Sequence, residues 1–356
     1  MLHVIIPVHI VPAGAQDKVA FWGLQNRPWG VEKLPCRLAC TFFSMSYKES
    51  QQWSSPWSGD LKKTLLLCLL LLGPFSRYSQ DPVPATDSAT AESKGDLFER
   101  VIANQERMEL ALDEFERTHK VETRKTGSDR KPYETRVWRL FPAGPTLNKL
   151  PISQDEIPVS PEAYREDLEK LEKYLVWVAQ GGPSQQDAYA KTQRKRKERN
   201  ELIVTTHEAF LFTRVAEERR GEQTLAKYTM VPNPKFKPTT RNATVFTRVR
   251  GMVWIEEESG ELAKIEGSVT EDISISLFLA KVYKGSSFMQ ERYEVVPGHW
   301  FPTYEQYDFD GRKFLLSFSL HQRTFYSDYK RVGPPKEAVA VVRDELNKLS
   351  KQKTAP

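Results

Sequence analysis

Short apolar segments separated by turn-forming residues fill the second half of this chain. The turns include Glu258-Ser259-Gly260, Pro297-Gly298 and Asp310-Gly311, whose residue types favour tight chain reversals. Apolar and polar residues alternate within several segments, as they do in strands with one buried face. Connections this short join antiparallel strands, because parallel pairing needs a crossover of about a dozen residues or more. The pattern predicts an antiparallel meander with strands at 208–216, 224–231, 251–257, 261–270, 273–284, 287–296, 301–308 and 313–325.

A helix and two strands are predicted ahead of this meander. Leu97, Val101 and Met108 recur at helical spacing and form one apolar stripe, which predicts a helix from residue 96 to about residue 117. Two strands are expected next, over 118–126 and 133–141.

The segment between these strands and the meander carries further helix signals. Ser160 is a suitable N-cap and Pro161 a suitable first residue for a helix over 161–178. The prolines of residues 142–161 predict an irregular crossing before it, and another helix is expected over 184–205. Residues 239–250 fit either a short helix or a strand. The sequence therefore predicts an α+β fold, in which a curled antiparallel sheet, an incomplete β-barrel, is covered by helices on one face.

Residues 61–80 have the pattern of a secretory signal peptide. Lys62 and Lys63 precede the apolar core Leu65–Leu72, after which the chain turns polar. The core is too short for a membrane-spanning helix, which needs about 20 apolar residues. These features predict export to the periplasm of a bacterium.

The predicted signal divides the chain into further parts. We interpret residues 1–60 as an extension produced by a wrongly assigned start codon, and residues 81–95 as a flexible leader rich in Pro and Ser. The main domain is expected over 96–332, with the basic helix at 184–205 as an insertion. Residues 333–356 are expected to form a helical C-terminal tail.

Charge and cysteine content exclude some classes of function for the exported part. The chain has 52 Lys and Arg against 47 Asp and Glu, but residues 1–80 hold eight basic and four acidic residues, which leaves 44 against 43. This balance provides no overall attraction to nucleic acid or to anionic membranes. All three cysteines, Cys36, Cys40 and Cys68, precede the main domain, which excludes a cysteine nucleophile and cysteine-bound zinc there.

Residues suited to catalysis or metal binding are sparse in the main domain. Its histidines lack metal-binding helix spacing, and no motif of a nucleophile or of a phosphate-binding loop is present. His299 and Asp308 fall on neighbouring predicted strands, where a serine could join them, but such a trio arises readily by chance. We therefore expect a protein that is not an enzyme and that uses no metal and no cofactor.

A basic run on the helix at 184–205 allows two interpretations. It could bind an anionic partner through phosphate groups, either of nucleic acid or of lipid headgroups, or it could be the solvated face of an inserted helix. No aromatic residue is interleaved with the run, so we expect no nucleic-acid binding. The residues of this candidate patch are Arg194, Lys195, Arg196 and Lys197.

Aromatic residues are spread over most of the predicted strands. They could fill an ordinary core, or they could line an apolar cavity left by a curled sheet that fails to close. The sequence leaves both alternatives open, because both use the same residue types. The candidate cavity residues are Phe210, Phe212, Tyr228, Trp254, Phe278, Phe314 and Phe318.

Several short motifs resemble the outer-membrane lipoprotein-sorting proteins, a family similar to the carriers LolA and LolB. The likeness covers residues 95–332 and is strongest over 228–332. It implies a LolA-like half-barrel with a helical lid and an apolar cavity for a lipid or lipoprotein acyl chain. The motifs are Tyr228–Pro238, Gly251-Met252-Val253-Trp254-Ile255-Glu256, Ala263–Gly267, Lys281–Ser286, Trp300-Phe301-Pro302-Thr303 and Tyr326-Ser327-Asp328-Tyr329.

The resemblance implies a lipid-binding periplasmic protein in outer membrane biogenesis, with a role in transport and peripheral membrane contact. The alternative is an envelope regulatory or interaction module on the same fold, with a filled core and other envelope proteins as its partners.

Overall fold

The computed structural model of the protein describes residues 90–353, except residues 241, 276–279 and 314–315. The predicted start-codon extension, the signal peptide and residues 81–89 of the predicted leader lie outside the described residues. The candidate cavity residues Phe278 and Phe314 also lie outside them.

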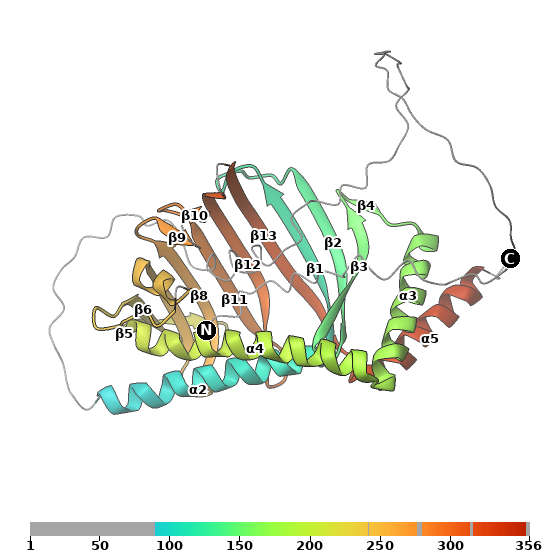
Figure 1. The fold of residues 1–356 in the computed structure, drawn as a ribbon, viewed down its shortest axis with the longest axis horizontal. Helices are drawn as coiled ribbons and strands as arrows, with labels where there is room; N and C mark the ends of the chain where they lie inside the picture. The colour runs from blue at the N-terminus through green and yellow to red at the C-terminus, as the bar shows by residue number, and fades with distance from the viewer. Residues whose placement is uncertain (1–89, 241, 276–279, 314–315, 354–356) are drawn as a thin grey trace, which may run out of the picture. The chain divides into compact units, whose positions relative to one another are not determined.

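The described residues form one large antiparallel sheet. Its strand order is β4-β3-β2-β1-β13-β12-β11-β8-β7-β6-β5, and β9 and β10 pair beside β12. Because β4 and β5 end this path, the sheet does not close into a barrel (Figure 1). The predicted fold class is confirmed. The strands are β1 (Phe115–Arg124), β2 (Glu134–Ala143), β3 (Thr146–Gln154), β4 (Ile157–Pro158), β5 (Phe210–Arg220), β6 (Gln223–Pro232), β7 (Val249–Glu256), β8 (Glu261–Val269), β9 (Ile273–Ile275), β10 (Ala280–Val282), β11 (Ser287–Val296), β12 (His299–Lys313) and β13 (Leu316–Arg331).

Three local predictions were wrong. The single strand predicted over 273–284 is two short strands, β9 and β10, that pair with each other. In the other two cases proline or glycine was taken for a break. The stretch 142–161 contains β3 and β4 rather than an irregular crossing. Its Pro151 lies at a register shift between β2 and β3, a place where a strand tolerates a residue without an N–H group. Gly311 forms no turn, because β12 continues to Lys313. A Cβ atom at Gly311 would lie 2.2 Å from the carbonyl oxygen of Lys281, so this glycine permits close approach of strand β10.

The helices are α2 (Thr90–Ala111), α3 (Pro161–Gln180), α4 (Pro183–Ala209) and α5 (Pro335–Lys353), with 3-10 turns η1 (Leu112–Glu114) and η2 (Asn242–Arg248). Helices α3 and α4 begin and end near their predicted limits, whereas α2 begins at residue 90 rather than 96 and ends at residue 111 rather than at about 117. The hydroxyl of Ser160 accepts a hydrogen bond from the N–H of Ala163, as its predicted N-cap role requires. Gly181, in the left-handed conformation, ends α3. Helix α2 begins at Thr90, so the last part of the predicted leader is helical.

Helices α2 and α4 run side by side over one face of the sheet (Figure 1). We call this the inner face, defined by its largest apolar cluster. Phe98 and Val101 of α2, Ile203 of α4 and Phe246 of η2 pack there on strand residues such as Ile265. Helices α3 and α5 form a separate cluster with β2 and β3. Burial of these apolar stripes supplies most of the stabilisation that holds the helices on the sheet.

Candidate ligand-binding site

The structure brings four of the predicted cavity residues together on the inner face. Phe210 and Tyr228 are buried within the inner cluster, and Phe212 and Phe318 pack against it while remaining half-buried. The Phe98 ring of α2 stacks on Phe212 at 4.2 Å and meets Tyr228 edge-on at 5.5 Å. Helix α2 therefore covers the aromatic part of the inner face directly.

Trp254 does not join these residues. Its neighbours along β7, Val253 and Ile255, belong to the inner cluster, and Trp254 packs instead with Leu225 and Trp300. Side chains alternate between the faces of a strand, so Trp254 lies on the opposite, outer face. There its indole N–H donates to a carboxylate oxygen of Glu218 at 2.7 Å.

A row of buried polar side chains continues the inner face beyond the aromatic cluster. Glu305 is buried and accepts hydrogen bonds from Gln290 at 2.8 Å, from Tyr307 at 3.0 Å and from Tyr326 at 3.1 Å. Burial raises the pKa of Glu305, although these hydrogen bonds oppose the shift. Burial likewise raises the pKa of Tyr307 and Tyr326 well above the ordinary value. The row is thus a largely satisfied hydrogen-bond network within the sheet.

Arg292 lies at one end of this row and is almost fully buried. Its Nε donates to Gln290 at 2.9 Å and its Nη1 to the carbonyl oxygen of Trp300 at 3.4 Å. Burial lowers the pKa of Arg292 to about 10, so the side chain stays charged at neutral pH. At the other end, His119 stacks between Trp138 and Tyr326. Burial lowers the pKa of His119 to about 3, which keeps it neutral.

Sequence reasoning missed this polar row, although a weak signal for it exists. On β11, Phe288, Gln290 and Arg292 occupy alternate positions and are all buried. On α2, the apolar stripe passes from Val101 to Met108 over Gln105, which is also buried. A polar residue inside an otherwise apolar period is the signal that could have identified these positions.

The predicted basic patch on α4 is divided by the structure. Arg196 forms two hydrogen bonds to the carboxylate of Asp113, at 2.9 and 2.7 Å, and its Nε lies 3.6 Å from Glu109. Arg199 pairs with Glu109 as well. These arginines therefore join α4 to α2 and η1. Burial lowers the pKa of Arg199 to about 10.

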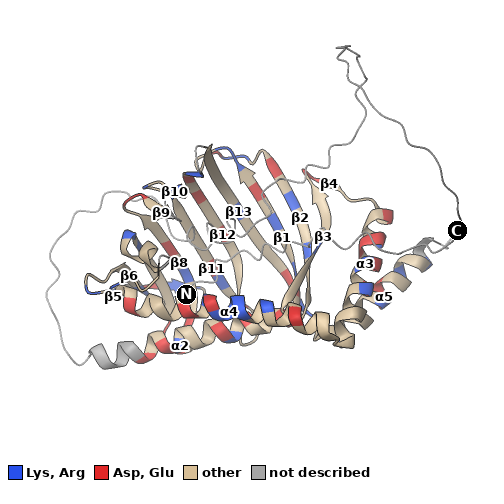
Figure 2. Ribbon diagram, viewed as in Figure 1, with Lys and Arg blue, Asp and Glu red and all other residues tan. Residues whose placement is uncertain are grey.

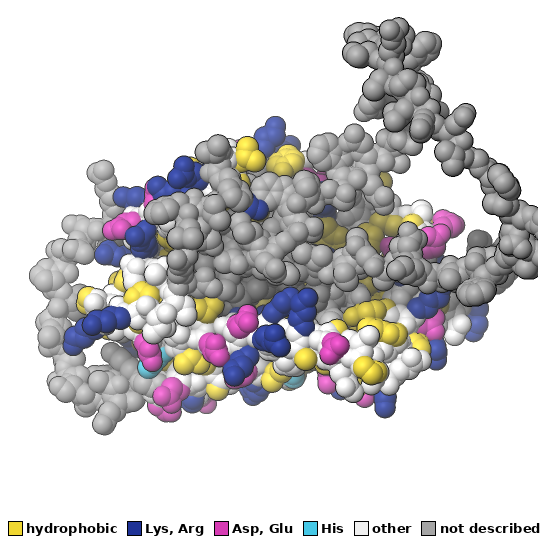
Figure 3. Space-filling view, in the orientation of Figure 1, with side chains coloured by type: hydrophobic (Ala, Val, Ile, Leu, Met, Phe, Trp, Pro, Cys, Tyr) yellow, Lys and Arg dark blue, Asp and Glu magenta, His cyan; other side chains and the backbone are white. Residues whose placement is uncertain are grey.

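The other members of the run, Arg194, Lys195 and Lys197, are exposed. Acidic residues of α2 lie beside the basic residues of α4 (Figure 2). In the face of the molecule that Figure 3 shows, basic and acidic side chains alternate along the helices. This arrangement gives mixed charge there rather than a single basic surface.

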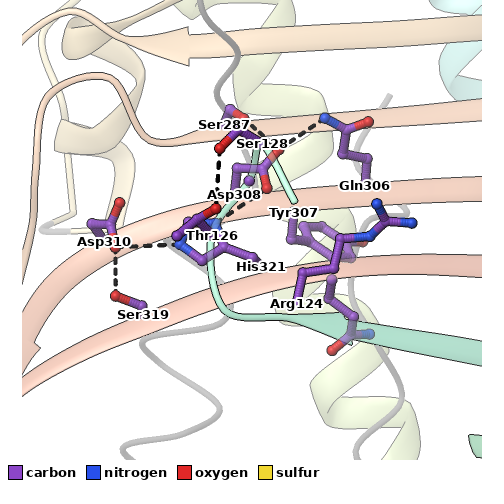
Figure 4. Close-up of polar contacts among 12 residues, drawn as sticks. Arg124, Thr126, Ser128, Ser287, Gln306, Tyr307, Asp308, Asp310, Ser319 and His321 are labelled. Atoms are coloured by element: carbon purple, nitrogen blue, oxygen red, sulfur yellow. Dashed lines mark hydrogen bonds and ion pairs between the residues drawn. The ribbon is translucent and has the colours of Figure 1, made fainter. Parts of the chain in front are cut away.

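A second polar cluster lies on the outer face around Asp308 (Figure 4). Asp308 accepts hydrogen bonds from Arg323 at 2.9 Å to each oxygen, from Gln306 at 2.8 Å and from Ser287 at 3.4 Å, and His321 Nδ1 lies 3.2 Å away. Burial raises the pKa of Asp308, but the Arg323 hydrogen bond and charge outweigh it and hold the pKa below its usual value.

This cluster does not have the geometry of a catalytic triad. The Ser287 hydroxyl donates to the aspartate, whereas a nucleophilic serine donates to the histidine. The His299 ring lies against Phe115 and Phe301 in tilted geometry instead of meeting Asp308. The outer cluster is an ion-pair network that ties β13 to β12, with Arg323 also donating to Gly127 ahead of β2.

Within the described residues, no group of His, Cys, Asp or Glu side chains could hold a metal ion. No helix in the same part of the chain is long and apolar enough to cross a membrane.

Comparisons with known proteins give structural similarities only. No family model matches the chain, and no curated protein matches it. Among solved structures, it is similar to an outer membrane lipoprotein-sorting protein domain from Vibrio parahaemolyticus, with 10% identity, a TM-score of 0.27, and coverage of 69% of this chain and 99% of that chain. It is also similar to a LolA superfamily protein from Nitrosomonas europaea, with 9% identity, a TM-score of 0.22, and coverage of 69% of this chain and 96% of that chain. A DUF1329 family protein from Desulfovibrio piger shows 8% identity and a TM-score of 0.24, with coverage of 67% of this chain and 92% of that chain. The first two carry the names of the family that the motifs of residues 228–332 resemble.

Proposed function

We propose that the protein is a periplasmic, non-enzymatic binding protein that shelters a lipid or lipoprotein acyl chain between the inner face of its sheet and helices α2 and α4. The observation that carries this proposal is the incomplete burial of the apolar inner face. Phe212, Phe236, Phe318 and Leu320 pack against the inner cluster but keep part of their surface accessible. Half-buried apolar groups on such a cluster suit an acyl chain, since covering them releases water from apolar surface.

The open sheet and the helices α2 and α4 that cover its inner face are compatible with ligand entry between them. Helix α2 is held on the sheet by its apolar stripe and by side-chain contacts such as those of Asn104 and Arg107 with Gly260 and Glu261. None of these contacts belongs to the strand ladder, so the helix can move away without breaking it. The resemblance of the motifs to the lipoprotein-sorting proteins supports the same ligand class.

A second candidate function is a regulatory or interaction module with a filled core. The near-complete burial of Phe210 and Tyr228 favours it, because side chains that already pack on the core need no ligand. In this case the exposed residues Arg194, Lys195 and Lys197 of α4 would be the place to seek an acidic envelope protein as the partner.

The two candidates make different predictions for Phe318. We expect Phe318→Ser to weaken binding of a fluorescent acyl probe, cis-parinaric acid, by about fivefold, because it removes half-buried apolar surface from the ligand site. The measurement is a fluorescence titration of the full chain.

Phe325→Ser is the matched control for this titration. Phe325 lies on the same strand and is also partly exposed, at 38%, but it pairs with Tyr304 on the outer face. Its substitution should leave probe affinity unchanged. Equal losses in both variants, or no binding by the unmodified chain, would count against the ligand site.

A further inference from the structure

Gln105 interrupts the apolar stripe by which α2 packs on the inner face. It lies between Val101 and Met108 on the same side of the helix and has an exposed fraction of 0%. Neither its amide oxygen nor its amide nitrogen has a hydrogen-bond partner in the described part of the chain. A buried amide without partners is destabilising, so its presence beneath α2 calls for an explanation.

Two buried charged groups of the sheet also have polar atoms without a hydrogen-bond partner in the described part of the chain. Arg292 uses its Nε and Nη1, but its Nη2 has no partner among the described residues. Glu261 accepts from Arg107 through one oxygen at 2.7 Å, and its other oxygen has no partner there either. Arg220 donates to the carbonyl oxygens of both Arg292 and Ala263, so Arg292 of β11 lies beside Ala263 of β8. Glu261 lies two residues from Ala263 on the same strand, which places it near Arg292.

Contacts of α2 locate Gln105 over the same part of the sheet. Asn104 donates to the carbonyl oxygen of Gly260 at 3.0 Å, and Arg107 bonds to Glu261, so the residues one before and two after Gln105 contact the start of β8. One turn further along, Met108 packs on Phe301 of β12. The strand between β8 and β12 is β11, which carries Arg292.

The unpartnered atoms include both donors and acceptors. Arg292 Nη2 and Gln105 Nε2 donate, whereas Gln105 Oε1 and the free oxygen of Glu261 accept. A carboxylate or phosphate could serve only the donors, and it would bring negative charge towards Glu261. A hydroxyl group can serve both kinds of atom.

We propose that Gln105, Arg292 and Glu261 bind the hydroxyl-bearing head of a neutral acyl lipid, such as a glycerol ester, whose chain lies on the inner apolar cluster. This inference rests on the proposed function and specifies its ligand. Helix α2 thereby binds the head group of the ligand through Gln105 as well as covering its acyl chain. Arg292 and Glu261 bind the same head group from the sheet.

Calorimetric titration of the full chain with 1-oleoylglycerol and with oleate tests this assignment. The unmodified chain should bind 1-oleoylglycerol about tenfold more tightly than oleate. Gln105→Met removes the amide at similar volume, and it should remove this preference by weakening 1-oleoylglycerol binding about tenfold. Met108→Leu, one turn away on the same stripe, is the matched control and should preserve the preference.

The outcomes separate the two levels of the proposal. Equal affinity for both lipids, tighter binding of oleate, or an unchanged preference in Gln105→Met would overturn the head-group assignment and leave acyl binding in place. Failure of the unmodified chain to bind either lipid would overturn both. The preference of the unmodified chain tests the assignment even where Gln105→Met does not fold.

Discussion

Replacing Arg196 by glutamine is expected to lower the free energy of unfolding by about 3 kcal/mol. The Arg196 side chain is 11% exposed and its partner Asp113 is 24% exposed, so the pair is largely shielded from water. Removing one member leaves the other charge without its partner in a poorly hydrated place, which costs more than the loss of a surface ion pair. Urea denaturation of the full chain followed by circular dichroism measures the change.

Arg194→Gln is the matched control for this experiment. Arg194 belongs to the same basic run but is exposed, so its substitution should change stability by less than about 0.5 kcal/mol. Similar effects of the two substitutions would show that the α2–α4 ion pairs do not hold the helices together. The experiment thereby decides whether the basic run joins α4 to α2 and η1 or forms a uniform surface patch.

Replacing Gly251 by valine is expected to destabilise the sheet by about 3 kcal/mol, at the upper end of the usual cost of overpacking. A Cβ atom at Gly251 would lie 2.1 Å from the carbonyl oxygen of Glu266 and 3.0 Å from the Cα atom of Gly267. These are backbone atoms of the neighbouring strand β8, which cannot move without breaking the ladder between β7 and β8. Thermal and urea unfolding measure the loss.

Met252→Val provides the control on the same strand. Met252 is only partly buried and packs against the outer-face cluster, so a β-branched residue should fit there with a change below about 1 kcal/mol. If Gly251→Val were as stable as Met252→Val, the glycine of the Gly-Met-Val-Trp motif would have no packing role.

The meander was predictable from sequence because its strands and turns carry local signals. The limits of β11, for example, match the predicted 287–296, since alternation and the Pro297-Gly298 turn define both ends. The strand β3 was missed because Pro151 was taken as a sign that no strand forms there. Its place beside β2 depends on a register shift that no local pattern reveals. The pairing of β1 with β13, the first and last strands along the described chain, is equally invisible in a local pattern.

The candidate site was predictable only in its apolar part. Phe210, Phe212, Tyr228 and Phe318 came together because strand periodicity places them on one face. Trp254 was grouped with them for its residue type alone, although its neighbours on β7 show that it has the opposite orientation. Arg196 looked like a surface cation because its partner, Asp113, lies far away in the sequence and meets it only in the folded chain.

The central claim, that the inner face binds an acyl chain, is tested most directly by mass spectrometry of the full chain purified without detergent. Organic extraction of the protein should release an acyl lipid in roughly equimolar amount, and native spectra should show the same mass bound to the folded chain. The head-group assignment further predicts that this lipid is neutral and carries a free hydroxyl group. A folded chain that releases no lipid and takes up neither 1-oleoylglycerol nor oleate would contradict the claim.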